Sequence, residues 1–107
     1  MTWNITFYNH KVETDTLAFP PGIQAHFLRI AEMMETIGPN LGKPYTSAMG
    51  EGLFEIRAKG KEGIGRSLFC TIKGHEIVIL HSFIKKTQKT PQQALALARK
   101  RMKDVTT

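Results

Sequence analysis

Several segments of the chain show the alternation of apolar and polar side chains that is typical of β-strands. Residues 3–8, 53–58 and 66–73 alternate in this way, which is the period of strands buried on one face. Residues 77–84 form a nearly continuous apolar run rich in β-branched side chains, which predicts a strand buried on both faces. Because short connections join the last three of these strands, we expect them to form an antiparallel meander.

Two segments have the spacing of amphipathic helices. In the first, apolar residues recur every three or four positions and predict a helix with one apolar stripe from Ile23 to Ile37, preceded by Pro20-Pro21-Gly22. The members of this stripe are Ile23, Phe27, Ile30, Met34 and Ile37. The second follows Thr90-Pro91, a pair typical of a helix start. Its narrow apolar face consists of Ala94, Leu95, Ala98 and Met102.

The connecting segments lack a regular period. Residues 11–19 have mixed polarity, and residues 42–52 are interrupted by Gly, Pro and Ser, so both are expected to be loops. Residues 59–65 contain three glycines and two lysines and are expected to form a flexible basic hairpin loop. The glycine spacing does not match a phosphate-binding loop, since no helix follows directly.

Length and composition fit one globular domain that spans residues 1–107. A chain of 107 residues with 41% hydrophobic residues can build a single core. The expected fold is α+β: a small antiparallel β-sheet with an N-terminal helical segment packed on one face and a C-terminal helix. Cys70 is the only cysteine, which excludes an intrachain disulfide and favours a reducing, cytoplasmic location. No apolar run approaches the roughly 20 residues that span a bilayer, so no membrane association is expected.

Charge is divided unequally along the chain. Residues 1–56 hold three basic and six acidic residues, a net charge of −3. Residues 57–107 hold twelve basic and three acidic residues, a net charge of +9. The whole excess of +6 therefore belongs to the half that carries the later strands and the last helix. Such a concentration of one sign is typical of a protein that binds nucleic acid, although a solvated basic surface gives the same pattern.

Candidate chemistry is limited to cations. The usual nucleophile motifs, metal-binding histidine pairs and paired carboxylates do not occur, and neither a metal nor another cofactor is expected. Arg57 ends one predicted strand, Arg66 begins the next, and Lys85 and Lys86 follow the apolar run. A meander brings these positions to one end of the sheet. Converging cations could stabilise the transition state for cleavage of RNA by its own 2′-hydroxyl, and plain phosphate binding without cleavage fits the same residues.

Three further polar residues have simpler expected roles. Glu55 lies on the same face as Arg57, and an ion pair with a cation of a neighbouring strand is the simpler expectation. His81 lies inside the apolar run, where a hydrogen-bonded core residue is commoner than a catalyst. His26 falls off the apolar stripe of its helix and is expected at the surface.

At the level of whole motifs, the chain resembles the phage-derived branch of the RelE/HigB toxin superfamily over essentially its full length. The residues that carry the resemblance are Gly52–Arg57, Arg66, the H-x-F-x-K-K-x-x-K-T-P run of residues 81–91, and Ala98 and Arg101 in the last helix. The run of residues 81–91 is the most specific part.

The resemblance implies a toxin of a type II toxin–antitoxin pair that cleaves mRNA on the ribosome. It also implies a cognate antitoxin, which in this branch is commonly a helix-turn-helix DNA-binding protein. Arg57, Arg66, Lys85 and Lys86 match basic catalytic positions, whereas Glu55 stands where some relatives have a catalytic lysine. Gln92 lies near the position of a tyrosine in those relatives.

Further contacts with nucleic acid are expected from basic residues outside the catalytic cluster. These residues are Lys43, Lys59, Lys61, Lys89 and Arg101. The competing interpretation is a non-catalytic basic module that binds nucleic acid or a partner protein, including a toxin relative without activity.

Overall fold

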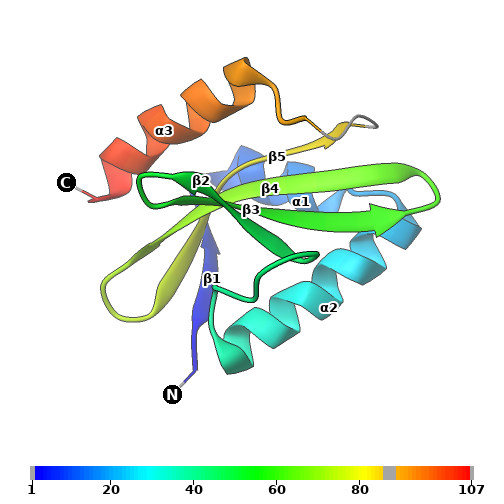
Figure 1. The fold of residues 1–107 in the computed structure, drawn as a ribbon, viewed down its shortest axis with the longest axis horizontal. Coiled ribbons are helices and arrows are strands. Elements are labelled where there is room, and N and C mark those ends of the chain that lie inside the picture. Colours follow the sequence, from blue (N-terminus) through cyan, green and yellow to red (C-terminus); the bar gives the residue numbers. More distant parts are fainter. Residues whose placement is uncertain (1, 86–88, 107) are drawn as a thin grey trace.

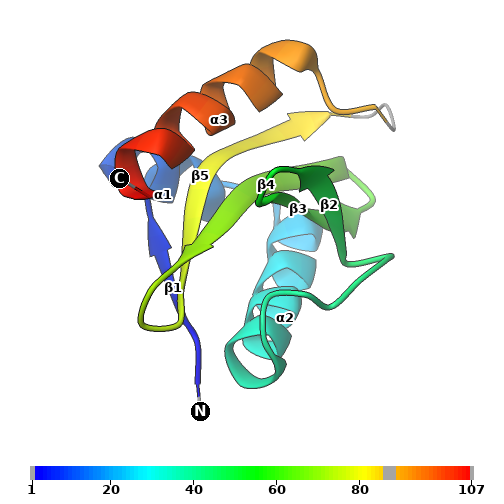
Figure 2. The same ribbon diagram turned by 60° about the vertical axis from the view of Figure 1, so that its left-hand side comes forward.

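The computed structural model describes residues 2–85 and 89–106 and contains one mixed sheet between two layers of helices. The strands are β1 (Asn4–Phe7), β2 (Thr46–Gly50), β3 (Leu53–Gly60), β4 (Gly63–Ile72) and β5 (Glu76–Lys85), and the helices are α1 (His10–Leu17), α2 (Pro21–Ile37) and α3 (Gln92–Thr106). Figures 1 and 2 show α1 and α2 on one face of the sheet and α3 on the other. The predicted α+β class is confirmed.

The strands lie in the order β1-β5-β4-β3-β2. Strands β3 to β5 form the predicted antiparallel meander. Strand β2, in a region expected to be a loop, pairs antiparallel with β3 and forms one edge. Strand β1 forms the other edge and runs parallel to β5, so the sheet is not wholly antiparallel. A parallel pair needs a long connection, and here most of the chain separates the two strands.

The alternation along the strands supplies two cores, one on each face of the sheet. On the α2 side, Ile56 and Phe69 pack with four members of the predicted helical stripe. Those four are Ile23, Phe27, Ile30 and Met34, each at most 3% exposed. Ile37, the last residue of α2, is instead 72% exposed, so the stripe ends one turn earlier than predicted. On the α3 side, Leu68 and Cys70 pack against the helix, and burial raises the pKa of the Cys70 thiol.

Residues 11–19 were expected to be a loop, but most of them belong to α1. The side chain of Asn9 caps this helix by accepting a hydrogen bond from the Val12 backbone N–H at 2.9 Å. Val12 and Thr16, one turn apart, are its buried residues. An eight-residue helix with two buried positions shows little periodicity, which explains the wrong prediction.

The expected loop at residues 42–52 contains the edge strand β2, and the expected flexible loop at residues 59–65 is a tight turn. Pairing of β3 with β4 continues to Gly60 and Gly63. The glycines here allow close packing of α2 on the sheet, because a Cβ atom at Gly65 would lie 2.5 Å from Ile23 Cγ2. Composition alone does not distinguish glycine for close approach from glycine for flexibility.

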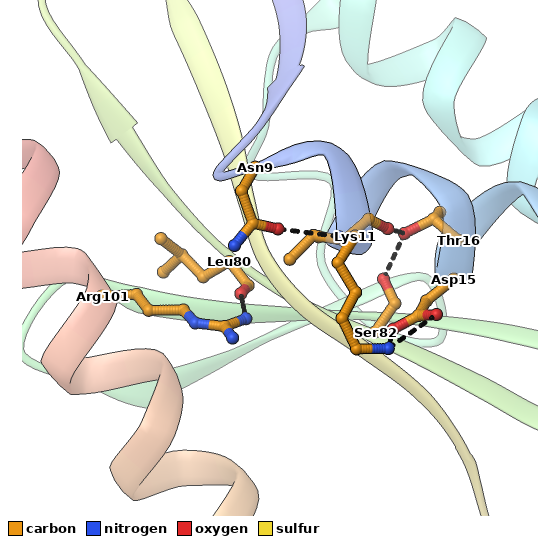
Figure 3. A network of polar contacts seen from close by, with 8 residues as sticks. Asn9, Lys11, Asp15, Thr16, Leu80, Ser82 and Arg101 are labelled. Atoms are coloured by element: carbon orange, nitrogen blue, oxygen red, sulfur yellow. Dashed lines mark hydrogen bonds and ion pairs between the residues drawn. The ribbon is translucent and has the colours of Figure 1, made fainter.

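Strand β5 contains a β-bulge at Leu80. Leu68 of β4 pairs with His81 and Phe69 pairs with Ile79, which leaves Leu80 without a partner in the ladder. The guanidinium of Arg101 on α3 donates a hydrogen bond to the Leu80 carbonyl at 2.7 Å. On the other side of β5, Thr16 of α1 contacts the hydroxyl of Ser82 at 2.7 Å (Figure 3). Helices on both faces therefore hold β5 in place.

Candidate nucleic-acid interface

Strand register brings the predicted basic residues to one end of the sheet. Arg57 of β3 pairs with Arg66 of β4, which pairs with Phe83 of β5. In the adjacent row, Lys59 pairs with Ile64, which pairs with Lys85. Cross-strand partners share a face, and so do residues two apart on one strand. Arg57, Lys59, Arg66 and Lys85 therefore lie on the α3 face, near the β3–β4 turn.

A groove of about 710 Å³ lies beside this row, between residues 40–44 and strands β2 and β3. Lys43, Arg57 and Lys59 line it together with neutral side chains. Lys43 and Lys59 are exposed, and the side chain of Arg57 is 23% exposed. None of its described lining residues is acidic, so the groove presents positive charge to solvent.

A buried polar network lies next to Arg57 under the α3 face. Glu55 Oε1 accepts hydrogen bonds from Arg57 Nε at 2.8 Å and from an Arg66 terminal nitrogen at 3.5 Å. The other carboxylate oxygen, Oε2, accepts a hydrogen bond from the Thr90 hydroxyl at 2.5 Å. The Thr90 hydroxyl in turn accepts one from Arg66 at 3.2 Å. The expected ion pairing of Glu55 with a neighbouring strand is confirmed.

Burial gives the two arginines different roles. The Arg66 side chain, which was predicted to be catalytic, is 0% exposed and therefore does not lie at the surface where an RNA phosphate would bind. Burial lowers the pKa of Arg66, while the neighbouring Glu55 carboxylate opposes this change. A guanidinium nevertheless stays protonated, so Arg66 supplies a fixed positive charge beneath the surface. Arg57, which lines the groove, is the arginine within reach of a ligand.

The remaining predicted residues lie around this site or apart from it. Lys61 is exposed at the β3–β4 turn, and Lys89 is exposed before α3. Lys86 lies outside the described residues. Arg101 contacts the Leu80 carbonyl and stacks its guanidinium over the Tyr8 ring, 5.0 Å from the ring centroid. These contacts give Arg101 a packing role away from the groove.

Thr90 is the site residue that sequence reasoning missed. Thr90-Pro91 predicts a helix cap, but α3 begins at Gln92 and the Thr90 hydroxyl donates its hydrogen bond to Glu55. The side chain is 8% exposed. Its place in the run of residues 81–91, the most specific part of the resemblance, was the available signal.

The two histidines singled out by the sequence occupy structural positions. His81 stacks on Phe83 with ring centroids 5.2 Å apart. Burial, and secondly the charge of Arg101, lowers the pKa of His81. His26 Nδ1 accepts a hydrogen bond from the Lys59 backbone N–H at 2.7 Å, which ties α2 to the strand that lines the groove.

The described part of the chain has neither a cluster of metal ligands nor a membrane-spanning helix. Within residues 2–85 and 89–106, no three side chains of His, Cys, Asp or Glu come together as ligands for a metal ion. Within these ranges, no helix is long and apolar enough to cross a membrane.

Comparison with known proteins places the chain in a family. A chain in the crystal structure of the archaeal RelE-RelB complex from Pyrococcus horikoshii OT3 superposes with a TM-score of 0.59 at 20% identity, covering 83% of this chain and 100% of that chain. This similarity shows a RelE-like fold. None of the curated protein sequences matches. Residues 14–103 match the family described as Phage derived protein Gp49-like. Because that match spans most of the chain, the protein belongs to the Gp49-like family of phage-derived proteins, a RelE/HigB-like toxin family.

Proposed function

We propose that this protein is the toxin of a type II toxin–antitoxin pair and cleaves mRNA on the ribosome without a metal ion. Family membership and the RelE-like fold support a toxin of this kind. The observation that carries the cleavage proposal is the groove lined by Lys43, Arg57 and Lys59 beside the buried Glu55–Arg66 pair. It concentrates positive charge where an RNA phosphate could lie.

The reaction is attack of a ribose 2′-hydroxyl on the adjacent phosphate. The O2′–P bond forms and the P–O5′ bond breaks, while the 2′-hydroxyl loses a proton and the leaving O5′ gains one. Negative charge grows on the non-bridging oxygens in the transition state. Arg57 is proposed to contact these oxygens, since a guanidinium can donate two parallel hydrogen bonds. Arg66 contributes its charge from below without touching the RNA.

The lysines surround this phosphate position. Lys43 and Lys59 bind the RNA backbone within the groove, and Lys85 approaches from the far side of the same face, two strand spacings or about 10 Å from Lys59. Lys61 and Lys89, which are both exposed, are proposed to contact the RNA backbone, and Lys86 is proposed to take part in catalysis. An RNA contact of Arg101, which the sequence also predicted, would compete with its contacts to the Leu80 carbonyl and the Tyr8 ring. Backbone contacts of this kind make binding fall as salt concentration rises.

An antitoxin is the proposed protein partner. The structurally similar archaeal chain was crystallised as a RelE-RelB complex, and we propose that this chain likewise has a cognate antitoxin, of helix-turn-helix type. Action on ribosomes places the toxin in the cytoplasm.

A second candidate is a basic module that binds RNA without cleaving it. The complete burial of Arg66 and Glu55 favours it, because the Arg66 guanidinium then does not contact an RNA phosphate and the Glu55 carboxylate does not reach the RNA to transfer a proton. The two candidates share the groove and differ in whether the RNA is cut.

Expression in cells, with mapping of mRNA 5′ ends on translating ribosomes, tests the proposal. Wild type is compared with Arg57→Met, which removes the proposed phosphate contact, and with Lys73→Ala as a matched control. Lys73 is exposed at the β4–β5 turn, so its removal also deletes one positive charge. Wild type and the control are expected to arrest growth and produce new ends, whereas Arg57→Met does neither. Absence of new ends with wild type refutes cleavage, and equal cleavage by Arg57→Met refutes the role of Arg57.

A further inference from the structure

Three segments distant in the sequence meet at the carboxylate of Glu55. Glu55 is on β3, Arg66 is on β4, and Thr90 lies between β5 and α3. Their hydrogen bonds close a ring, in which Thr90 donates to Glu55, and Arg66 donates to both. Glu55 and Arg66 are 0% exposed and Thr90 is 8% exposed.

Stability alone is a weak reason for such a ring. Transfer of an ion pair from water to a protein interior has a large desolvation cost, and apolar side chains of similar volume often give a fold that is equally stable. Functional side chains are, however, commonly held in their working geometry by hydrogen bonds from the residues around them. The group next to this ring is Arg57, whose Nε donates to Glu55 Oε1.

The ring leaves the carboxylate little freedom to turn. Glu55 Oε2 is held by the Thr90 hydroxyl, while Oε1 faces Arg66 and Arg57. Loss of the Thr90 hydroxyl would leave Oε2 without this donor in a buried site, which is costly for an ionised oxygen. The carboxylate would then rotate toward Arg66, and the hydrogen bond to Arg57 Nε would weaken.

We infer that Thr90 and Glu55 are positioning residues that hold the Arg57 guanidinium at the wall of the groove. This inference rests on the proposed function, in which Arg57 contacts the RNA phosphate. Lys43 and Lys59 are exposed and reach the groove on long side chains, whereas Arg57 is anchored at Nε. An anchored guanidinium is oriented before the substrate arrives, so less ordering remains to be done in the transition state.

Thr90→Val removes the hydroxyl and keeps the shape of the side chain, and Thr90→Ser keeps the hydroxyl. Thr16→Val is the matched control, because Thr16, at 0% exposure, is likewise buried and hydrogen-bonded, but on the opposite face of the sheet. Cleavage is measured on programmed ribosomes over a range of ribosome concentrations. Thr90→Val should lower kcat by about 10- to 100-fold with KM changed less than about twofold. Thr90→Ser and Thr16→Val should cleave like wild type.

A second measurement does not depend on cleavage. The Nε–H of Arg57 is followed by ¹⁵N NMR in the free protein, where the hydrogen bond to Glu55 should slow its exchange with water. Thr90→Val should speed this exchange by about tenfold or more, as expected for loss of about 1.4 kcal/mol or more of protection, and Thr16→Val should not. If Thr90→Val does not fold, Thr90→Ala replaces it, since it also removes the hydroxyl and leaves the Glu55–Arg66 pair intact.

The outcomes separate the inference from the proposed function. Unchanged Arg57 exchange in Thr90→Val overturns the inference, and so does a Thr90→Ser variant that is as impaired as Thr90→Val. If wild type does not cleave mRNA, the proposed function fails, but the exchange measurement still decides whether Thr90 positions Arg57.

Discussion

Removal of one partner from the buried pair of Glu55 and Arg66 should destabilise the protein strongly. Glu55→Leu leaves the Arg66 guanidinium charged at 0% exposure. Arg66→Met leaves the Glu55 carboxylate in the same surroundings, with Arg57 and Thr90 as its remaining partners. Replacement of both residues removes both charges, so the double variant should be much less affected than the single variants suggest.

The size of the effect follows from burial. Loss of one partner of a buried ion pair costs about 3–5 kcal/mol. A domain of 107 residues has a total free energy of unfolding of roughly 5–16 kcal/mol, so each single variant should lose a large part of it. At roughly 4 °C per kcal/mol, the midpoint of thermal unfolding should fall by about 12–20 °C. The double variant should lose at least about 2 kcal/mol less than the sum of the single losses.

Urea unfolding followed by circular dichroism measures all four free energies under one set of conditions. Linear extrapolation is suitable because a single domain of this size usually unfolds in one transition. The reasoning is refuted if either single variant loses less than about 1 kcal/mol, which would be typical of an exposed pair. It is also refuted if the two losses add within about 0.5 kcal/mol, because residues that share a buried charge must couple.

Three other measurements address the packing around the site. NMR titration should give a pKa for His81 below the usual value of about 6.5, and Arg101→Gln should raise this pKa, because burial and the Arg101 charge both favour neutral imidazole. Since the unfolded chain binds the proton more readily, His81 lowers the stability of the protein as pH falls below that usual value. An unchanged His81 pKa in Arg101→Gln would contradict the assignment. The backbone hydrogen bond from Gly22 lowers the pKa of Glu62, so the ionised carboxylate stabilises the fold at pH above its usual pKa of about 4.3, and this stabilisation is lost as pH falls through the lower pKa of the folded state. Glu62→Gln should therefore lower the urea midpoint at pH 7 and have less effect at low pH. An equal effect at both pH values would exclude this linkage. Gly65→Ala should cost about 1–3 kcal/mol by overpacking against α2, and a loss below about 0.5 kcal/mol would show that the helix can shift.

Local periodicity was enough to predict most of the regular structure. The alternation in β3 and β4, the apolar run in β5 and the stripe from Ile23 to Met34 each depend on residues that are neighbours in the same element. Helix α1 was missed because it buries only Val12 and Thr16. Strand β2 was missed because an edge strand with small and polar side chains has little apolar pattern.

The candidate site was predicted in part. The order of strands in a meander brings Arg57, Arg66 and Lys85 to one end, and the register confirms that arrangement. The sequence does not show which arginine is buried, since both lie in strands with the same alternation of apolar and polar residues, and their side chains are on the same face of the sheet. In the folded chain Arg66 is buried and hydrogen-bonded to Thr90, whereas the Arg57 side chain is 23% exposed.

Sequence patterns therefore identified every described element except α1 and β2, and also the excess of positive charge in the second half of the chain, because both depend on local composition. Three features required the folded chain: the parallel pairing of β1 with β5, the groove between residues 40–44 and β3, and the ring of Glu55, Arg66 and Thr90. Each depends on segments far apart in the sequence, whose contacts are chosen by how the helices cover the two faces of the sheet. Arg57 and Arg66 are equivalent in the sequence pattern, and only the packed structure makes Arg66 a buried charge and Arg57 a guanidinium that lines the groove.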